Sequence, residues 1–363
     1  MIRLTDGIEF SVHGRQELEV VHGNLWQNLS DLPSTRRTNG YQSHASKRFM
    51  CPTCYATSFL LVHPSGFDHT CFEYRSDWRH LKYAFHARNA DPVRAQVIRD
   101  CRGVLWTPLN FLPGWMPGGS AVVDVMHCFF LGLVKHVTKV IIVKHGLLNA
   151  SSSTNPIELL EEFFEGITWP PEVTRLPPSM AHGKGSIKAD QWRNLIAILF
   201  VGLFVAWQRH GTDSTIPPDA LDAEVAAVAP DRNLSRHYDA ILEFSAAIRI
   251  LTTRRISPAD ARRGGAALSR AAQTWASMHM PLTPYFHFAQ HVEEQIYKYG
   301  PTYGSWTYSF ERNNAVLARF NHNQHKGGEL EATLMRRWWS IMFNYELVRI
   351  FVPLSVEYCD LVA

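Results

Sequence analysis

Apolar and polar residues alternate near the start of the chain and then recur at helical spacing through most of its length. The alternation over 8–12 and a second apolar run over 18–21, separated by turn residues at 13–15, predict two paired strands. From Asp124 onward the apolar positions repeat at steps of three and four, which is typical of a helix. Further helices are expected over 190–209, 219–229, 236–253 and 258–279.

The last third of the sequence has clear start and stop signals. Thr283 can cap a helix with Pro284 at its first position, where the missing N–H removes no hydrogen bond. This helix is expected to run to Tyr299, because Gly300 and Pro301 follow. Three more elements are expected after it: a strand over 303–308, a helix over 310–320 and a helix from 329.

Strand and helix signals are mixed at both ends of the chain, whereas the middle is helical. This order predicts an α/β core interrupted by a large, mainly helical insertion. Four segments are expected: 1–60, a partial core with a Cys-x-x-Cys motif; 61–123, an irregular connecting region; 124–280, the helical insertion; and 281–363, helices that return to the core.

Composition excludes several classes of protein. With 19% charged and 12% aromatic residues among 363, the chain is not wholly disordered. The apolar, uncharged run 194–208 is shorter than the roughly 20 residues of a membrane helix, so it predicts a buried helix and no membrane partner. No apolar leader opens the chain, and six scattered Cys favour a reducing compartment over secretion. A net charge of +3 does not indicate nucleic-acid binding unless basic residues cluster.

Cys51 and Cys54 are separated by two residues. Two thiolates at this spacing can hold one tetrahedral Zn²⁺, each at roughly 2.3 Å. The pair is only half of a zinc site. Two buried thiols or a redox motif are the alternatives on these residues alone.

The best source of the missing ligands is the pair His287 and His291. Their i, i+4 spacing places both imidazoles on one face of a helix, where they can bind the same ion. Because the apolar stripe of this helix, which includes Phe288 and Val292, is on the opposite face, both histidines are predicted to lie outside the core. A solvent-exposed pair without a ligand is the alternative.

Other residues compete for the same role. His44, His69 and Cys71 are rival ligands because they lie near the two cysteines in the sequence. No His-Glu-x-x-His helix is present, so a zinc protease is not indicated.

Two carboxylates have matched spacings to these residues. Asp31 lies 20 residues before Cys51, and Glu311 lies 20 residues after His291. A Zn²⁺ shared by the cysteines and histidines would join the two regions, so both carboxylates could reach one site. Two metal ions about 4 Å apart, held by acidic side chains, can activate a nucleophile and stabilise the leaving oxygen of a phosphodiester. Solvation at the surface is the alternative for each carboxylate.

Several blocks of the sequence together resemble transposases of the CACTA (En/Spm) type, in particular their fungal copies. The resemblance covers about two thirds of the chain, and the block over 284–337 is the most specific. The blocks are Asp124-Val125-Met126-His127, Lys188-Ala189-Asp190-Gln191-Trp192, Gly300-Pro301, Phe310-Glu311-Arg312 and the run over 321–331.

The resemblance implies an RNase H-like fold that cuts and rejoins DNA at transposon ends with an Asp-Asp-Glu triad and Mg²⁺ or Mn²⁺. Asp31 would be the second carboxylate and Glu311 the third, and Arg312 and Lys326 are candidates for phosphate contacts. It also implies nuclear localisation and is compatible with a homo-oligomer.

The same resemblance assigns two further sets of residues. It implies a structural zinc site, shared with the catalytic subunit of the V(D)J recombinase, at Cys51, Cys54, His287 and His291. Asp124 and His127 match an Asp-x-x-His motif whose chemical role does not follow from the residues. The alternative for this pair is a helix N-terminus with a buried polar pair.

The first carboxylate of the triad is not found at the expected distance. Only 24 residues separate Asp6 from Asp31, too few for the two strands and the helix that must lie between the carboxylates. We therefore expect the first Asp to precede Met1 and the chain to be a truncated copy with slow or absent strand cleavage. A transposase-derived DNA- or partner-binding module without catalysis is the alternative, and an unrelated helical structural protein is a third.

Overall fold

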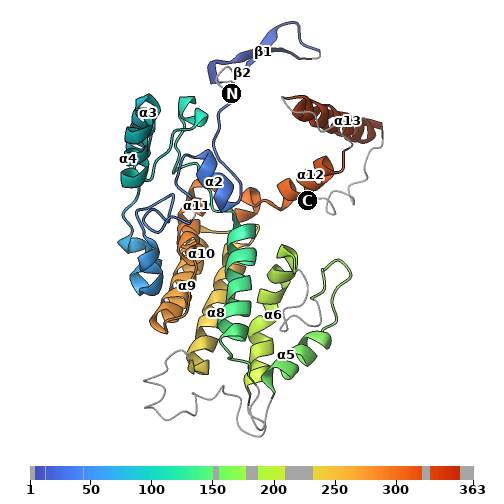
Figure 1. The fold of residues 1–363 in the computed structure, drawn as a ribbon. Coiled ribbons are helices and arrows are strands. Elements are labelled where there is room, and N and C mark those ends of the chain that lie inside the picture. Colours follow the sequence, from blue (N-terminus) through green and yellow to red (C-terminus); the bar gives the residue numbers. More distant parts are fainter. Residues whose placement is uncertain are drawn as a thin grey trace. The chain divides into compact units, whose positions relative to one another are not determined.

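The computed structural model describes residues 5–12, 14–43, 45–149, 155–176, 187–208, 232–320 and 328–351. They are mostly helical and divide into two compact units, Met1–Trp306 and Thr307–Ala363. The helices of the first unit are α2 (Leu32–Thr38), α3 (Asp77–Asn89), α4 (Pro92–Arg102), α5 (Pro156–Glu165), α6 (Ala189–Trp207), α8 (Leu234–Leu251), α9 (Pro258–Ser277), α10 (Pro284–Phe288) and α11 (Val292–Tyr299) (Figure 1). A long π-helical element, Met126–Val134 followed by Val137–Lys144, is called the 126–144 helix here.

The predicted hairpin near the start of the chain is confirmed. Strands β1 (Ile8–Ser11) and β2 (Leu18–Val21) pair antiparallel, with Ile8 opposite Val21. Their side chains are mostly exposed, as the short length of the strands leads us to expect. Among the described residues this is the only sheet, so the molecule is mainly helical with a small β-element. The RNase H-like core stays a prediction.

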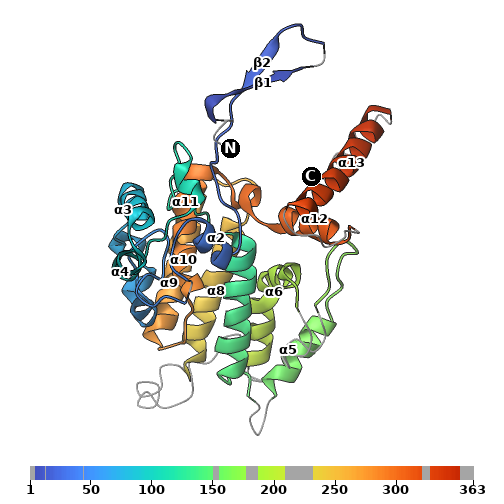
Figure 2. The same ribbon diagram turned by 45° about the horizontal axis from the view of Figure 1, so that its top comes forward.

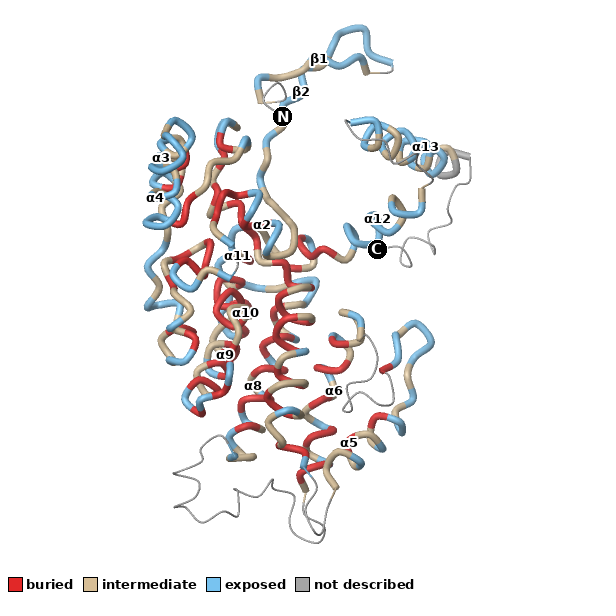
Figure 3. Tube along the Cα trace, in the orientation of Figure 1, coloured by how far each residue is buried: buried red, intermediate tan, exposed pale blue. Residues whose placement is uncertain are grey.

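The apolar core of the first unit lies where the 126–144 helix, α6, α8 and α9 pack together. These helices run side by side in both views (Figures 1 and 2), and their buried residues concentrate along the shared faces (Figure 3). The Trp275 ring is fully buried and meets the rings of Phe244 and Phe286 edge to face, with centroids 5.5 and 6.0 Å away. Truncation of such a side chain to Ala typically costs about 3–5 kcal/mol.

Most predicted helices of the middle segment are confirmed. The uncharged run becomes α6, and the expected helices at 236–253 and 258–279 become α8 and α9. Gly202 lets α5 approach α6 closely, because a Cβ at this position would lie 2.6 Å from a Leu160 methyl carbon. The expected helix at 219–229 lies outside the described residues.

Two helices of the core, Met126–Lys144 and Ala189–Trp207, are long and apolar enough to cross a membrane. Length and composition alone are weak evidence, because the core helices of soluble proteins pass the same test. One face of α6 is buried against α5, α8 and the 126–144 helix. The absence of a membrane partner stays a prediction.

Two expectations about local structure were wrong. The segment expected as irregular, 61–123, contains α3 and α4, whose N-termini are capped by the side chains of Ser76 and Asp91. These caps define the helices although the apolar periodicity is weak. The expected strand at 303–308 is instead a 3₁₀ turn, Thr302–Ser305, because the Thr302 hydroxyl donates to the Leu251 carbonyl at 2.7 Å and fixes the segment on the helical core.

The predicted helix from 284 to 299 has the expected ends but not the expected regularity. It consists of α10, a 3₁₀ turn over Ala289–His291, and α11. It ends at Gly300, which has a φ of +83°. The second unit contains α12 (Tyr308–Ala318) and α13 (Glu329–Phe351), close to the two helices expected there.

Candidate metal centre

The four predicted zinc ligands come together in the core. Sγ of Cys51 lies 3.3 Å from Nε2 of His291, and Sγ of Cys54 lies 3.1 Å from Nε2 of His287. The four ligand atoms lie within 4.8 Å of one another, and all four residues are buried. Ligand atoms around a tetrahedral Zn²⁺ are roughly 3.5 Å apart at ordinary Zn–S and Zn–N lengths. The cluster therefore fits a metal such as zinc, and the two cysteines are not an isolated pair.

The prediction that the histidines lie outside the core was wrong. His287 and His291 are 0% and 1% exposed. The face opposite the apolar stripe is covered by other parts of the chain, including the Phe72 ring, whose centroid is 4.6 Å from that of His287 and 5.2 Å from that of His291. The helical pattern alone identifies which face is apolar, but not what covers the other face.

The cysteines are placed by a short backbone pairing. Cys54 forms an antiparallel bridge with Tyr74, and the N–H of Arg75 donates to the Thr53 carbonyl at 2.9 Å. Within the turn, the N–H of Thr53 donates to Sγ of Cys51 at 3.3 Å. N–H donation to a sulfur favours its thiolate form.

A backbone carbonyl also orients the His287 ring, through the ring nitrogen that does not face the cysteines. Nδ1 of His287 lies 2.7 Å from the Gly66 carbonyl, so Nδ1 carries the proton and Nε2 is left for the metal. Gly66 is needed for this approach, because a Cβ there would lie 2.1 Å from the Leu60 carbonyl oxygen. This contact is the outer support that metal-binding histidines usually have.

A buried arginine holds the chain just before Cys51. Arg36 in α2 is 1% exposed, and its guanidinium donates to the carbonyls of Gln42, Phe49 and Met50. Burial lowers the pKa of Arg36 to about 10, and the charge of Cys51 partly offsets this effect. The thiolate is thus part of what balances this buried cation.

Without a bound metal ion, the pKa values of the two thiols move in opposite directions. Burial raises the pKa of Cys51, but the hydrogen bond with Cys54 and the two imidazoles outweigh burial and hold it well below its ordinary value. The hydrogen bond with Cys51 and burial raise the pKa of Cys54. Burial lowers the pKa of His287, yet its interactions with Cys51 raise it overall. A divalent cation would compensate both thiolates at once.

Two of the three rival ligands do not join this cluster, and the third is not described. His69 and Cys71 are exposed, and His44 lies outside the described residues. Within the described ranges, no second group of three or more metal-binding side chains is found.

Asp124 and His127 form a pair at the start of the 126–144 helix. One Asp124 oxygen accepts from Nδ1 of His127 at 2.6 Å and from the His127 backbone N–H at 3.0 Å, and the other accepts from the Met126 N–H at 3.3 Å. The side chain of Asp124 is 2% exposed and that of His127 is 23% exposed. This arrangement is the helix N-terminus with a buried polar pair that the sequence left open.

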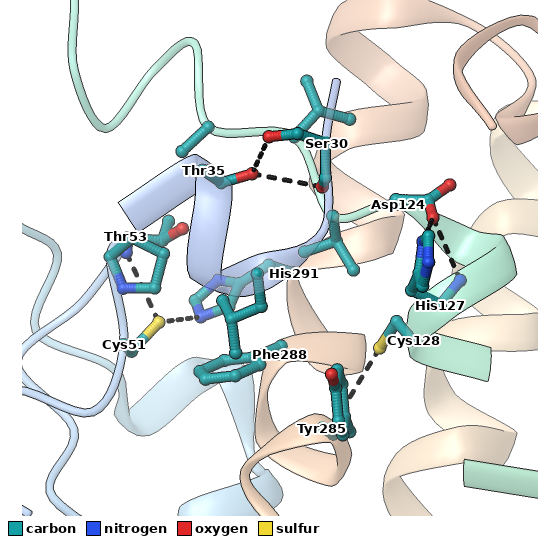
Figure 4. A pocket seen from close by; sticks show the side chains of 15 residues that line it. Ser30, Thr35, Cys51, Thr53, Asp124, His127, Cys128, Tyr285, Phe288 and His291 are labelled. Carbon is teal, nitrogen blue, oxygen red and sulfur yellow. Dashed lines mark hydrogen bonds and ion pairs between the residues drawn. The ribbon is translucent and has the colours of Figure 1, made fainter. Parts of the chain in front are cut away.

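The pair and the metal centre line the same small cavity, which has a volume of about 30 Å³. Figure 4 shows Cys51 and His291 on one side of it and Asp124 with His127 on the other, with Tyr285 below. Burial, followed by the charges of Cys128, Asp31 and Asp124, raises the pKa of Tyr285. Sequence reasoning did not single out Tyr285, because its i, i+3 relation to Phe288 indicated an ordinary apolar position.

Asp31 is the N-cap of α2. One of its carboxylate oxygens accepts from the Ser34 N–H at 2.8 Å, and its neighbours Ser30 and Leu32 line the cavity. Asp followed by Leu and Pro at the start of a helix is a capping signal that the sequence already contained. Asp31 therefore lies near the metal centre, but its role as a magnesium ligand stays a prediction.

The other predicted residues cannot be added to this site. Glu311 and Arg312 belong to α12 in the second unit, so the pairing of Glu311 with Asp31 is untested. Lys326 lies outside the described residues. No protein-family model and no curated protein matches the chain, so the transposase resemblance is carried by its motif blocks alone.

Proposed function

We propose that the chain is a transposase-like protein of the CACTA type, whose catalytic region is held together by a structural zinc ion. The observation that carries the proposal is the Cys51, Cys54, His287 and His291 cluster, because the resemblance names these four residues and their ligand atoms lie within 4.8 Å of one another. The two pairs are 233 and 240 residues apart in the chain, so chance proximity is a poor explanation.

The zinc would serve the fold and not the reaction. Four protein ligands complete a tetrahedral site and leave no position for water or substrate. In the proposed function, Asp31 and Glu311 would bind Mg²⁺ or Mn²⁺ through oxygen atoms, as these ions prefer. These ions would supply charge stabilisation for phosphoryl transfer at transposon ends.

One observation favours the non-catalytic alternative. Asp31 and Asp124 both act as helix caps, and the cavity beside them has room for about one water molecule. Carboxylates used in this way stabilise helices whether or not they bind an ion. A transposase-derived module that binds DNA without cutting it is therefore the second candidate.

The test is a strand-transfer assay with purified protein, Mn²⁺ or Mg²⁺, and DNA from the ends of the element that carries the gene. If the chain is catalytic, products form and disappear in Asp31→Asn and Glu311→Gln. Asp260→Asn, a remote exposed carboxylate, serves as the matched control. If the DNA is bound but never cut, the non-catalytic module is the correct function. Absence of both binding and zinc would refute the proposal as a whole.

A further inference from the structure

The positive charge of the chain is concentrated in one short segment. Residues 75–102 contain seven Arg and Lys residues and three Asp residues, whereas the whole chain has a net charge of only +3. The remainder is therefore slightly acidic. The segment covers α3 and α4, which lie side by side in Figures 1 and 2 and are largely exposed in Figure 3. The low net charge thus conceals a clustered basic surface.

This surface contains a cavity of about 420 Å³. That volume falls within the roughly 300–1,000 Å³ typical of small-molecule sites. Four cations line the cavity, from Arg75, Arg79, Lys82 and Arg102, and Glu73 is the one carboxylate in its lining. The spacing of Arg79 and Lys82 places both on one face of α3. The lining is suited to an anion that carries more than one charge.

Planar groups accompany these cations. The Arg102 guanidinium lies over the Tyr83 ring, 4.8 Å from its centroid, and the Arg75 guanidinium lies 5.0 Å from the centroid of Tyr55. All four residues line the cavity. Arginine planes and aromatic rings are the surfaces on which unpaired bases stack.

The lining includes an arginine donor that is buried without an acceptor among the described residues. Nη2 of Arg75 is buried, and no hydrogen-bond acceptor for it is found in the part of the chain that the structure describes. Its Nε, by contrast, donates to the Cys54 carbonyl at 3.0 Å, which fixes the guanidinium. An oriented, buried donor without an acceptor indicates a group supplied by a ligand.

The basic surface continues beyond this cavity. A second hollow of about 720 Å³ includes Arg37 and Arg99 in its lining. Cys101, Arg102 and Val104 line the first hollow, whereas Arg99, Asp100 and Leu105 line the second, so the two hollows meet at the end of α4. Two cationic hollows on either side of one helix end suit a chain of phosphates better than a single free phosphate.

We propose that the cavity between α3 and the end of α4 binds one nucleotide of a single-stranded DNA. Arg79, Lys82 and Arg102 contact its phosphates, and its base stacks on the planar groups of the lining. The neighbouring nucleotides continue into the second hollow. This inference rests on the proposed function, because it names the surface that holds the DNA of a transposase-like protein.

The experiment measures binding of a short fluorescein-labelled oligothymidylate to the zinc-loaded protein by fluorescence anisotropy. The variant Arg79→Ala/Lys82→Ala is compared with Arg249→Ala/Arg255→Ala, which removes two exposed cations elsewhere. We expect the first variant to bind at least about tenfold more weakly and the second to change little. The slope of log affinity against log salt should fall by roughly 1.4 in the first variant only, since each single-strand phosphate contact contributes about 0.7.

Two further measurements, photocrosslinking and competition, test whether single-stranded DNA is the ligand of this cavity. Photocrosslinking with a 4-thiothymidine oligonucleotide should label peptides that contain Tyr55, Tyr83 or Arg102, and Tyr83→Leu should reduce the yield. Equal losses in both double variants would overturn the proposal, because net charge alone would then explain binding. Competition by inorganic phosphate at equal phosphate concentration, or equal affinity for duplex DNA, would overturn it too. Zinc content and strand transfer report on the proposed function separately, so either can fail without the other.

Discussion

His287 and His291 face thiols more than 230 residues away in the chain, whereas His127 faces a carboxylate only three residues before it. Residues of both sites line the same cavity, but the side chains of the two sites obtain their hydrogen-bonding and charged partners differently. The Asp124–His127 pair is local, because the carboxylate accepts from the ring and from two backbone N–H groups within three residues. In the thiol–imidazole cluster, the pKa values of the two thiols move in opposite directions without a bound metal ion. The comparison separates a polar pair made by neighbouring residues from a cluster of distant residues that could hold a metal ion.

Loss of the ion is expected to have the largest effect. His291→Ala should abolish binding of one Zn²⁺ per chain and lower the free energy of unfolding by about 3–5 kcal/mol, because it breaks a buried charged cluster. Metal analysis and urea unfolding measure both effects. His69→Ala, at an exposed histidine, is the matched control and should change neither. Unchanged zinc in His291→Ala would remove this residue from the centre.

A third histidine sharpens the comparison, because His80 is buried with the Tyr41 ring 4.6 Å from its own. Burial, with a smaller effect of Arg75, lowers its pKa from 6.5 to about 3. The unfolded state therefore takes up a proton below pH 6.5 that the folded state does not. The contribution of His80 to stability consequently decreases as the pH falls from 6.5 towards 3. At pH 5 the loss should be about 2 kcal/mol.

His80→Gln should flatten this part of the pH dependence. Urea unfolding of wild type and variant at pH 7, 6 and 5 measures the difference, and zinc content checks that the centre is intact. His69→Gln is the control, since this residue is exposed. A variant whose unfolding free energy keeps the wild-type slope would show that His80 is protonated in the folded protein.

The local pair is expected to contribute less than the metal centre. Asp124→Asn should lower the free energy of unfolding by about 1–2 kcal/mol, because Asn still caps the helix but loses the charged bond to His127. Zinc content should stay at one per chain. Asp91→Asn, at the exposed cap of α4, should have a smaller effect on the same unfolding measurement. Loss of zinc in Asp124→Asn would mean that the two sites depend on each other.

The sequence predicted the ligands of the metal centre but not its surroundings. The spacings of Cys51 with Cys54 and of His287 with His291 are local, so they can be recognised in a single sequence. What covers the histidines, such as Phe72, comes from tertiary packing and leaves no local pattern. For the same reason the α3–α4 surface was missed, because its cations are spaced among aromatic residues and do not form a run.

Helices with strong apolar periodicity and clear caps were predicted close to their observed ends, as α6, α8 and α9 show. The strand expected at 303–308 failed because alternation of aromatic residues does not supply a partner strand. An RNase H-like core depends on long-range strand pairing, which single-sequence patterns describe least well. The four-residue cluster, by contrast, follows from two local spacings that a single sequence contains.

The smallest expected effect separates the two roles of Asp31. As an N-cap, its carboxylate accepts from the Ser34 N–H, and Ser performs this task about as well as Asp. Asp31→Ala should therefore destabilise the chain by about 1 kcal/mol in urea unfolding, whereas Asp31→Ser should be close to wild type. A serine hydroxyl carries no negative charge, so it is expected to bind Mg²⁺ or Mn²⁺ more weakly than the carboxylate does.

The two Asp31 variants give different results for the two functions. If Asp31 only caps α2, Asp31→Ser keeps both its stability and any rise in melting temperature that Mn²⁺ produces. If it also binds the ion, Asp31→Ser keeps its stability in the absence of Mn²⁺ but loses that rise. Ser34→Ala leaves the accepting carboxylate and the donor N–H in place, so it is the control. Because Asp31 caps α2 in the structure, this comparison decides whether a helix-capping carboxylate near the candidate metal centre also takes part in catalysis.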